Sequence, residues 1–344
     1  MKTLVVFLLV IAIACGVGAY AIYERAQSPF QARGSGATLV EIPSGEGTSA
    51  IGRRLVAAGV MRDELTFRVA LWLSGSARRL QAGEYRFDRP MSALEAVDKI
   101  ARGEVDLMPL TFPEGLTIAE MSRVFEGGGF GTAASFVAAA RNASLVRALD
   151  PAASNLEGYL FPDTYALSRR ADAAQVVGAM VARFEQVLSS DVRVAAQARG
   201  WSVRQLVTLA SLVEKETARP DERPVVAAVY ANRLRIGMGL QCDPTVIYAL
   251  QLAGAYTGNL RRDDLAFDSP YNTYKYAGLP PGPIAAPGKG SLEAAARPAD
   301  APYLYFVSRN DGSHEFAASL EEHNRNVRKY QVLYFRERRA REGR

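Results

Sequence analysis

Residues 206–217 read LVTLASLVEKET, residues 225–234 read VVAAVYANRL, and residues 239–248 read GLQCDPTVIY. The first two are apolar at helical spacing, and proline or glycine separates each run from the next. We therefore predict three helices whose ends converge on a short loop that carries acidic side chains.

The first helix has clear limits. Ser202 predicts an N-cap, because its hydroxyl can accept a hydrogen bond from a free backbone N–H, and Pro220 lacks the donor that a longer helix needs. Glu214 and Glu216 then lie in the last two turns, where the negative end of the helix dipole disfavours carboxylates. This unfavourable placement is mild evidence that the acids have a function.

Helical geometry does not decide which acid is functional. Leu206, Leu209 and Val213 form an apolar stripe, and at about 100° per residue Glu214 and Glu216 fall on its opposite flanks. Either carboxyl can be half-buried, and the alternative for both is a solvated surface turn.

The other two helices add polar groups. Asp221 is expected to cap the second helix, which carries Asn232 and Arg233 near its end, and Arg233 is suited to hold an acidic or sugar oxygen. Asp243 followed by Pro244 predicts the cap and first residue of the third helix.

The chain resembles the YceG-like, or MltG, family of endolytic murein transglycosylases. The similarity rests on the three segments above and covers nearly the whole chain through EGYLFPDTY (157–165), SPYNTY (269–274), GLPPGPI (278–284), APG (286–288) and PYLYFV (302–307). One departure is Cys242, where the family pattern leads us to expect threonine.

The resemblance implies a reaction and a catalytic residue. In the family the second glutamate of the Glu-Lys-Glu triplet is the catalytic acid, which corresponds to Glu216. It implies cleavage of the β-1,4 bond between N-acetylmuramic acid and N-acetylglucosamine in nascent glycan strands, with the muramic 6-hydroxyl closing a 1,6-anhydro ring. No metal or other cofactor is expected.

Several further residues are candidates for binding the glycan. They are polar groups near Glu216 and aromatic or amide groups of two motifs that we expect to line a groove: Glu214, Asn232, Arg233, Gln241, Asp243, Tyr159, Tyr271 and Asn272. Aromatic rings give flat apolar faces to sugars, although such clusters are more often core. The loop at residues 269–288, which also carries Tyr274 and Tyr276, is expected to line the cleft.

Composition limits the alternatives. The 344 residues are 49% hydrophobic and 22% charged, with a formal net charge of +5, which indicates a globular protein of about two domains. Cys15 and Cys242 provide no disulfide framework, and His314 and His323 lack zinc-site spacing. No reader motif indicates nucleic-acid binding.

The N-terminal region predicts a membrane anchor. Residues 3–23 carry no charge and span about 31 Å as a helix, which matches the hydrocarbon thickness of a bilayer. A signal peptide cleaved after Ala14 is the alternative, but the apolar run continues past that point. Lys2 favours a cytoplasmic N-terminus with the bulk of the chain outside. The family resemblance implies the outer face of the inner membrane, so we expect a single-pass inner-membrane protein with its catalytic domain in the periplasm.

We expect an α+β fold in four parts: an anchor and flank at residues 1–26, a tether at 27–37, a small module at 38–110 and a mainly helical catalytic domain with short strands at 111–344. The module is expected to run strand, helix, helix, strand, and residues 133–149, 171–198 and 320–341 of the catalytic domain are each expected to form a helix. This order is similar to the LysM-like module of the family, which implies glycan binding; a plain packing module is the alternative.

Two rival functions stay open at this point. A hydrolase would use Glu216 with Glu214 or Asp243 as a second carboxylate. A non-enzymatic scaffold would bind the cell wall for the synthases or the division and elongation machinery, but it leaves the Glu-Lys-Glu triplet unexplained.

Overall fold

The computed structural model describes residues 2–32 and 36–342. It divides the chain into two compact units: unit 1 contains Met1–Met108 and Ala166–Arg170, and unit 2 contains Pro109–Tyr165 and Ala171–Arg344. The chain passes from one unit to the other in β3 (Leu107–Thr111) and β4 (Thr164–Ser168), which form a two-stranded sheet with each other.

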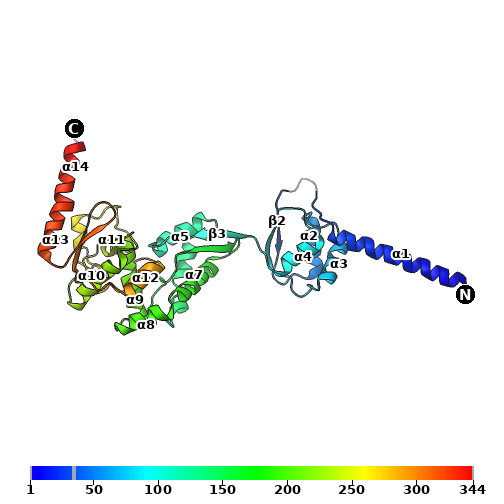
Figure 1. Cartoon of the computed structure of the whole chain (residues 1–344), viewed down its shortest axis with the longest axis horizontal. Helices are drawn as coiled ribbons and strands as arrows, with labels where there is room; N and C mark the ends of the chain where they lie inside the picture. The colour runs from blue at the N-terminus through cyan, green and yellow to red at the C-terminus, as the bar shows by residue number, and fades with distance from the viewer. Residues whose placement is uncertain (1, 33–35, 343–344) are drawn as a thin grey trace. The chain divides into compact units, whose positions relative to one another are not determined.

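Unit 1 is a small α+β module preceded by a long helix (Figure 1). Its elements are α1 (Lys2–Gln27), β1 (Thr38–Ile42), α2 (Thr48–Ala57), α3 (Glu64–Ser74), β2 (Gly83–Phe87) and α4 (Ala93–Ala101). The predicted order of strand, helix, helix and strand is confirmed. β1 and β2 are antiparallel, with Val40 opposite Tyr85, and both residues point into a core that includes Leu55, Phe67 and Ile100.

The segment predicted as a tether is partly packed against unit 1. Phe30 pairs with Met91 through backbone hydrogen bonds, and the Ala32 amide donates to the Gly59 carbonyl oxygen at 3.0 Å. Backbone groups that satisfy one another in this way hold residues 28–32 on the module. Residues 33–35 lie outside the described part of the chain.

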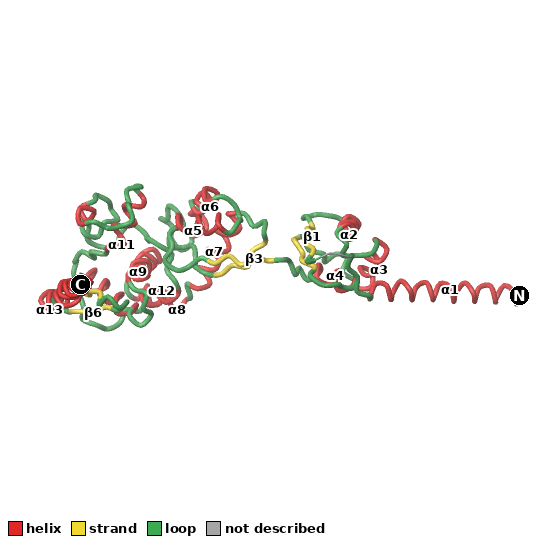
Figure 2. The backbone as a smooth tube through the Cα atoms, turned by 90° about the horizontal axis from the view of Figure 1, so that it is seen from above, coloured by secondary structure: helices red, strands yellow, loops and turns green. Residues whose placement is uncertain are grey.

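Unit 2 is mainly helical with short strands (Figures 1 and 2). Beyond β3 and β4 its elements are α5 (Ile118–Gly127), α6 (Ala133–Ala140), η1 (Ala143–Val146), α7 (Ala173–Val187), α8 (Ser190–Ala198), α9 (Val203–Glu216), α10 (Arg223–Arg235), α11 (Asp243–Leu252), η2 (Arg262–Ala266), α12 (Lys289–Ala296), β5 (Tyr305–Ser308), β6 (His314–Ala317), α13 (Leu320–Val327), the π-helical η3 (Arg328–Leu333) and α14 (Tyr334–Glu342). The predicted α+β class is confirmed.

Long helices expected from the sequence are divided in the structure. The helix expected at residues 171–198 breaks at Leu188, because Ser189 caps a new helix by accepting a hydrogen bond from Val192 N. The helix expected at 133–149 becomes α6 and η1, and η3 interrupts the one expected at 320–341. Strand β4 was not predicted.

Helix α9 is the centre of unit 2. It packs against α8, α10, α11 and α12, and eight consecutive residues, from Leu206 to Val213, are buried. A helix buried on all sides belongs to the interior of a domain, not to its surface. The two glutamates at its end are therefore carried into the protein.

Candidate active site

The beginning of α9 forms as the sequence predicts. The Ser202 hydroxyl accepts a hydrogen bond from Gln205 N at 3.2 Å, and the Gln205 side chain accepts one from Ser202 N at 2.9 Å. This capping box fixes the first turn. The helix ends at Glu216, where Thr217 takes up an extended conformation.

Glu214 is held by groups that join α9 to its neighbours. Arg223 of α10 lies 3.3 Å from its carboxylate, the Ser291 hydroxyl donates to it at 2.7 Å, and Gly288 N donates at 3.0 Å. Its side chain is 7% exposed. A buried carboxylate with a cation and two donors is satisfied by the fold. Glu214 thus has a structural role here and does not line the cavity described next.

Glu216 lines a polar cavity of about 220 Å³ that opens to solvent. The Tyr230 hydroxyl donates to its carboxylate at 3.1 Å, and the Cys242 thiol lies 3.6 Å away. Within the described residues, no lysine or arginine forms an ion pair with Glu216. Burial raises its pKa above the ordinary value, and the hydrogen bond from Tyr230 opposes this rise only in part. The carboxyl is therefore a suitable proton donor.

The other cavity residues come from several elements. They are Arg233, Leu240, Gln241, Asp243, Tyr274, Phe306 and His323. The predicted convergence of the ends of α9, α10 and α11 is confirmed, because Glu216, Arg233 and Asp243 line one cavity. Gln241 has a left-handed backbone conformation, with φ of 50°, in the loop that closes the cavity.

Arg233 is oriented by backbone carbonyl groups. Its guanidinium donates to Leu240 O at 2.7 Å and to Leu304 O at 2.6 Å, and it stacks over the Tyr305 ring. Carbonyl oxygens carry no net charge, and arginine stays protonated in proteins. Among the residues that the structure describes, no carboxylate forms an ion pair with Arg233, which thus brings a positive charge to the cavity.

The predicted caps of α10 and α11 are wrong by one residue. The N-cap of α10 is Glu222 instead of Asp221, and that of α11 is Cys242 instead of Asp243. In each case the side chain has another partner: Asp221 pairs with Arg219, and Asp243 accepts a hydrogen bond from Tyr274. The carboxylate of Asp243 is therefore turned toward Tyr274, which lines the same cavity.

The remaining predicted binding residues are not among those that line the cavity of Glu216. Asn232 donates to the carbonyl oxygens of Ala301 and Tyr303, and Asn272 donates to those of Leu265 and Phe267, so both amides hold loops. Their role in binding stays a prediction.

Two aromatic candidates also have partners elsewhere. Tyr159 is buried and donates to Asp150 at 2.6 Å. Tyr271 packs on Tyr248 and lines a separate cavity. In contrast, Tyr274 comes from the loop that we expected to line the cleft, and it lines the cavity of Glu216. Phe306 and His323 were not identified from the sequence as site residues; only the PYLYFV motif pointed to the strand of Phe306.

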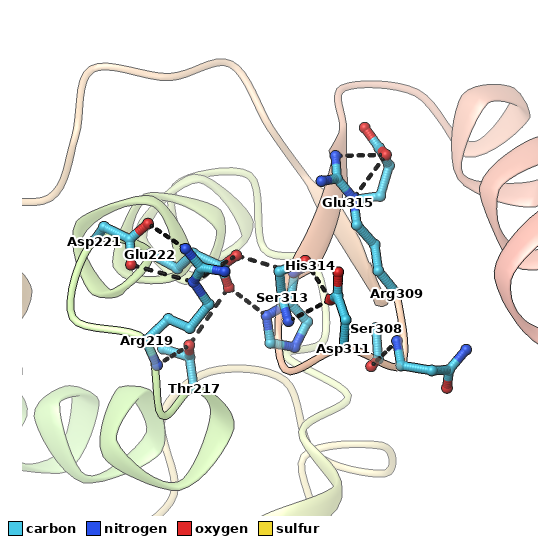
Figure 3. A network of polar contacts seen from close by, with 11 residues as sticks. Thr217, Arg219, Asp221, Glu222, Ser308, Arg309, Asp311, Ser313, His314 and Glu315 are labelled. Atoms are coloured by element: carbon cyan, nitrogen blue, oxygen red, sulfur yellow. Dashed lines mark hydrogen bonds and ion pairs between the residues drawn. The ribbon is translucent and has the colours of Figure 1, made fainter.

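A polar network fixes the hairpin β5–β6 beside the end of α9 (Figure 3). Glu222 accepts a hydrogen bond from His314 N at 3.0 Å, and its carboxylate lies 2.7 Å from His314 Nδ1. Thr217 also contacts Glu222, and Arg219 N donates to the Thr217 hydroxyl. The turn that follows Glu216 is thus tied to β6, whose partner strand β5 supplies Phe306.

A second buried acid lies outside this cavity. Glu157 accepts hydrogen bonds from Ile118 N, at the start of α5, and from the Tyr248 hydroxyl at 3.2 Å. Burial raises its pKa from 4.5 to about 8. At neutral pH the carboxyl is therefore protonated, and it has partners within the fold.

Replacement of Glu157 is expected to change the pH dependence of stability. Between pH 4.5 and about 8 the folded state keeps a proton that the unfolded state has released, so the stability of the wild type falls as the pH rises. Glu157→Gln imitates the neutral acid and removes this slope. Urea denaturation should show the variant gaining about 2–4 kcal/mol over the wild type from pH 5 to pH 9. Parallel curves for the two proteins would contradict the assignment.

Known proteins are similar to this chain over the regions described above. The sequence matches the profile of the YceG-like family over residues 40–329. It is 31% identical over 332 residues to an endolytic murein transglycosylase of Bacillus subtilis, covering 91% of this chain and 90% of that protein. A Streptococcus pneumoniae protein of the same name is 30% identical, and the match covers 95% of this chain but 65% of that protein.

A solved structure agrees with these sequence matches. The crystal structure of a YceG-like protein of Listeria monocytogenes superposes with a TM-score of 0.58 at 32% identity, over 84% of this chain and 98% of the other. The family match includes the cavity, the helix α9 and most of both units. This chain therefore belongs to the YceG-like family.

Proposed function

We propose that this protein is an endolytic peptidoglycan lytic transglycosylase that cleaves the bond between N-acetylmuramic acid and N-acetylglucosamine and leaves 1,6-anhydromuramic acid ends. The observation that carries the proposal is Glu216, a carboxyl with a raised pKa in a polar cavity, in a chain whose relatives are named endolytic murein transglycosylases. One acid of this kind suffices for the reaction.

Glu216 first acts as the general acid. It donates its proton to the glycosidic oxygen, and the bond from that oxygen to C1 of the muramic residue breaks with oxocarbenium-like charge at C1. The 6-hydroxyl of the same residue then attacks C1, and the Glu216 carboxylate accepts the hydroxyl proton. The acid is regenerated, and no water is consumed.

Other cavity groups fit binding roles in this reaction. Arg233 offers a positive charge that is not in an ion pair with any carboxylate of the described residues, and this charge is suited to the lactyl carboxylate or a sugar oxygen. Gln241 offers an amide, and the Asp243–Tyr274 pair offers an acceptor and a donor at the cavity edge. We assign these residues to substrate orientation, whereas Glu214 supports the site through α10 and α12.

The N-terminal helix supports a membrane location. Residues 6–27 form one helix long and apolar enough to cross a membrane, with a mean hydropathy of 2.4. We propose that it is an uncleaved inner-membrane anchor and that the catalytic domain, residues 111–344, lies in the periplasm close to nascent strands. The module at 38–110 is proposed to be LysM-like and to bind glycan. Peptidoglycan synthases or the division or elongation machinery are the proposed protein partners.

A hydrolase is the second candidate, because Asp243 lines the same cavity as Glu216 and provides another carboxylate. Incubation with purified sacculi and mass analysis of the products distinguishes the two. Anhydromuramic ends, one water lighter than reducing ends, are expected from the transglycosylase. Reducing ends would establish the hydrolase, and intact sacculi would favour a binding scaffold.

Glu216→Gln is expected to lower kcat roughly 10²–10⁴-fold, because the amide keeps the size of the side chain but has no proton to transfer. Release of anhydromuropeptides measures this loss. Glu157→Gln is the matched control, since it neutralises another buried acid with a raised pKa outside the cavity and should keep activity. Glu214→Gln should lower the unfolding temperature, because it removes the carboxylate that pairs with Arg223, and should change kcat per folded molecule little. An active Glu216→Gln variant would refute the assignment.

Tyr230→Phe is expected to move the alkaline limb of the pH–rate profile to higher pH. The Tyr230 hydroxyl stabilises the charged form of Glu216, so its loss raises the pKa further and keeps the acid protonated in more alkaline solution. Tyr248→Phe, which removes a hydroxyl from Glu157 instead, should leave the limb in place. A shift to lower pH in Tyr230→Phe would contradict the proposed role of Glu216.

A further inference from the structure

Helix α3 of unit 1 has an apolar outer face. Its inner residues Phe67, Ala70 and Leu71 are buried in the core, whereas Leu65, Trp72 and Leu73 are exposed. Trp72 is 80% exposed, and the neighbouring residues of this face are at helical spacing. Large apolar side chains gathered on a surface in this way indicate a binding surface.

This face continues onto α1. An apolar groove of about 480 Å³ lies between the two helices and is lined by Ala19, Tyr20, Ile22, Tyr23, Val69, Trp72 and Leu73. Both views show α3 next to the end of α1, with the strands of unit 1 on the far side of the module (Figures 1 and 2). Trp72 is thus at the level of the last apolar turns of α1.

The position of α3 along α1 is fixed by polar and apolar contacts. Arg25 near the end of α1 forms an ion pair with Asp63 at 2.7 Å, and Asp63 caps α3 by accepting a hydrogen bond from Thr66 N. Ala26 is fully buried. The last turn of α1 and the first turn of α3 are therefore joined by this ion pair, next to the buried Ala26.

The length of α1 then sets the depth of α3. The uncharged residues 3–23 extend about 31 Å, close to the hydrocarbon thickness of a bilayer, so Tyr20 and Tyr23 lie at its outer boundary when the helix spans it. Glu24 and Arg25 follow at the water side. Since Trp72 lines a groove with Tyr20 and Tyr23, it reaches the same boundary.

We propose that α3 lies in the interfacial layer of the membrane that holds α1, with Leu65, Trp72 and Leu73 in contact with lipid. This inference rests on the proposed anchor. Tryptophan and tyrosine prefer the headgroup level, because their rings are apolar and their N–H and O–H groups need water or headgroups. Arg68, exposed on the same helix, suits anionic headgroups. Unit 1 is consequently held against the bilayer instead of swinging on a tether.

Trp72 itself reports its surroundings. The chain has two tryptophans, so Trp201→Phe leaves Trp72 as the only indole in the full-length protein. This variant is reconstituted into vesicles of phosphatidylglycerol and phosphatidylcholine whose acyl chains carry bromine either near the headgroup or near the methyl end. Fluorescence measures contact with bromine, flotation measures membrane attachment, and circular dichroism checks the fold.

The control places an indole elsewhere on the same unit. Leu39 is exposed on β1, which lies on the side of unit 1 away from α1 (Figure 2). The control variant combines Leu39→Trp with Trp72→Phe and Trp201→Phe, so its only indole is at position 39. Bromine should not quench the fluorescence of this indole. The fluorescence of Trp72 should be quenched more by bromine near the headgroup than by bromine near the methyl end. Its emission should also lie at shorter wavelength than that of the indole at position 39 in the control.

The possible outcomes distinguish a failure of the proposed docking of α3 from a failure of the proposed anchor. Protein that floats with the vesicles while iodide in solution, and not bromine, quenches Trp72 overturns the docking of α3 but keeps the anchor. Protein that does not float overturns both. Shielding from both quenchers that grows with the ratio of protein to lipid would identify another protein copy in the groove and overturn the lipid assignment.

Discussion

The burial of the central eight residues of α9, Leu206 to Val213, is the constraint on which the rest of unit 2 depends. Eight consecutive buried residues require neighbours on every side, and α8, α10, α11 and α12 supply them. Because the helix ends next to these neighbours, the Glu214 side chain is almost fully buried and Glu216 faces a cavity instead of an open surface. The fold must neutralise, protonate or solvate each of them, and these solutions define the site.

Three buried glutamates are accommodated in three different ways. Glu214 stays paired, because Arg223 and two donors replace its hydration. Glu157 is protonated at neutral pH and has partners at the start of α5 and in α11. Glu216 has a raised pKa, forms no ion pair within the described residues and faces a cavity. It combines an available proton with a polar cavity that also holds Arg233, Gln241 and Asp243, and acid–base chemistry on a bound glycan requires such a combination.

Local signals in the sequence were sufficient for much of the fold. Ser202 predicted the start of α9, because a capping box needs only residues within one turn. The choice between Glu214 and Glu216 required tertiary structure, since Arg223 and Ser291 come from other helices. The role of Glu222 also required tertiary structure, because its partner His314 lies far along the chain. Aromatic motifs indicated a groove, but only the fold shows which rings are core and which reach the cavity.

The proton on Glu216 is the centre of this account, and its affinity can be measured directly. With carbon-13 in the glutamate carboxyl groups, a pH titration followed by NMR and compared with Glu216→Gln isolates the signal of this residue. The account predicts an apparent pKa above the ordinary value of 4.5. A titration at or below 4.5 would mean that Glu216 is ionised at neutral pH, and it would contradict the proposed role of this residue as the acid that cleaves the glycan.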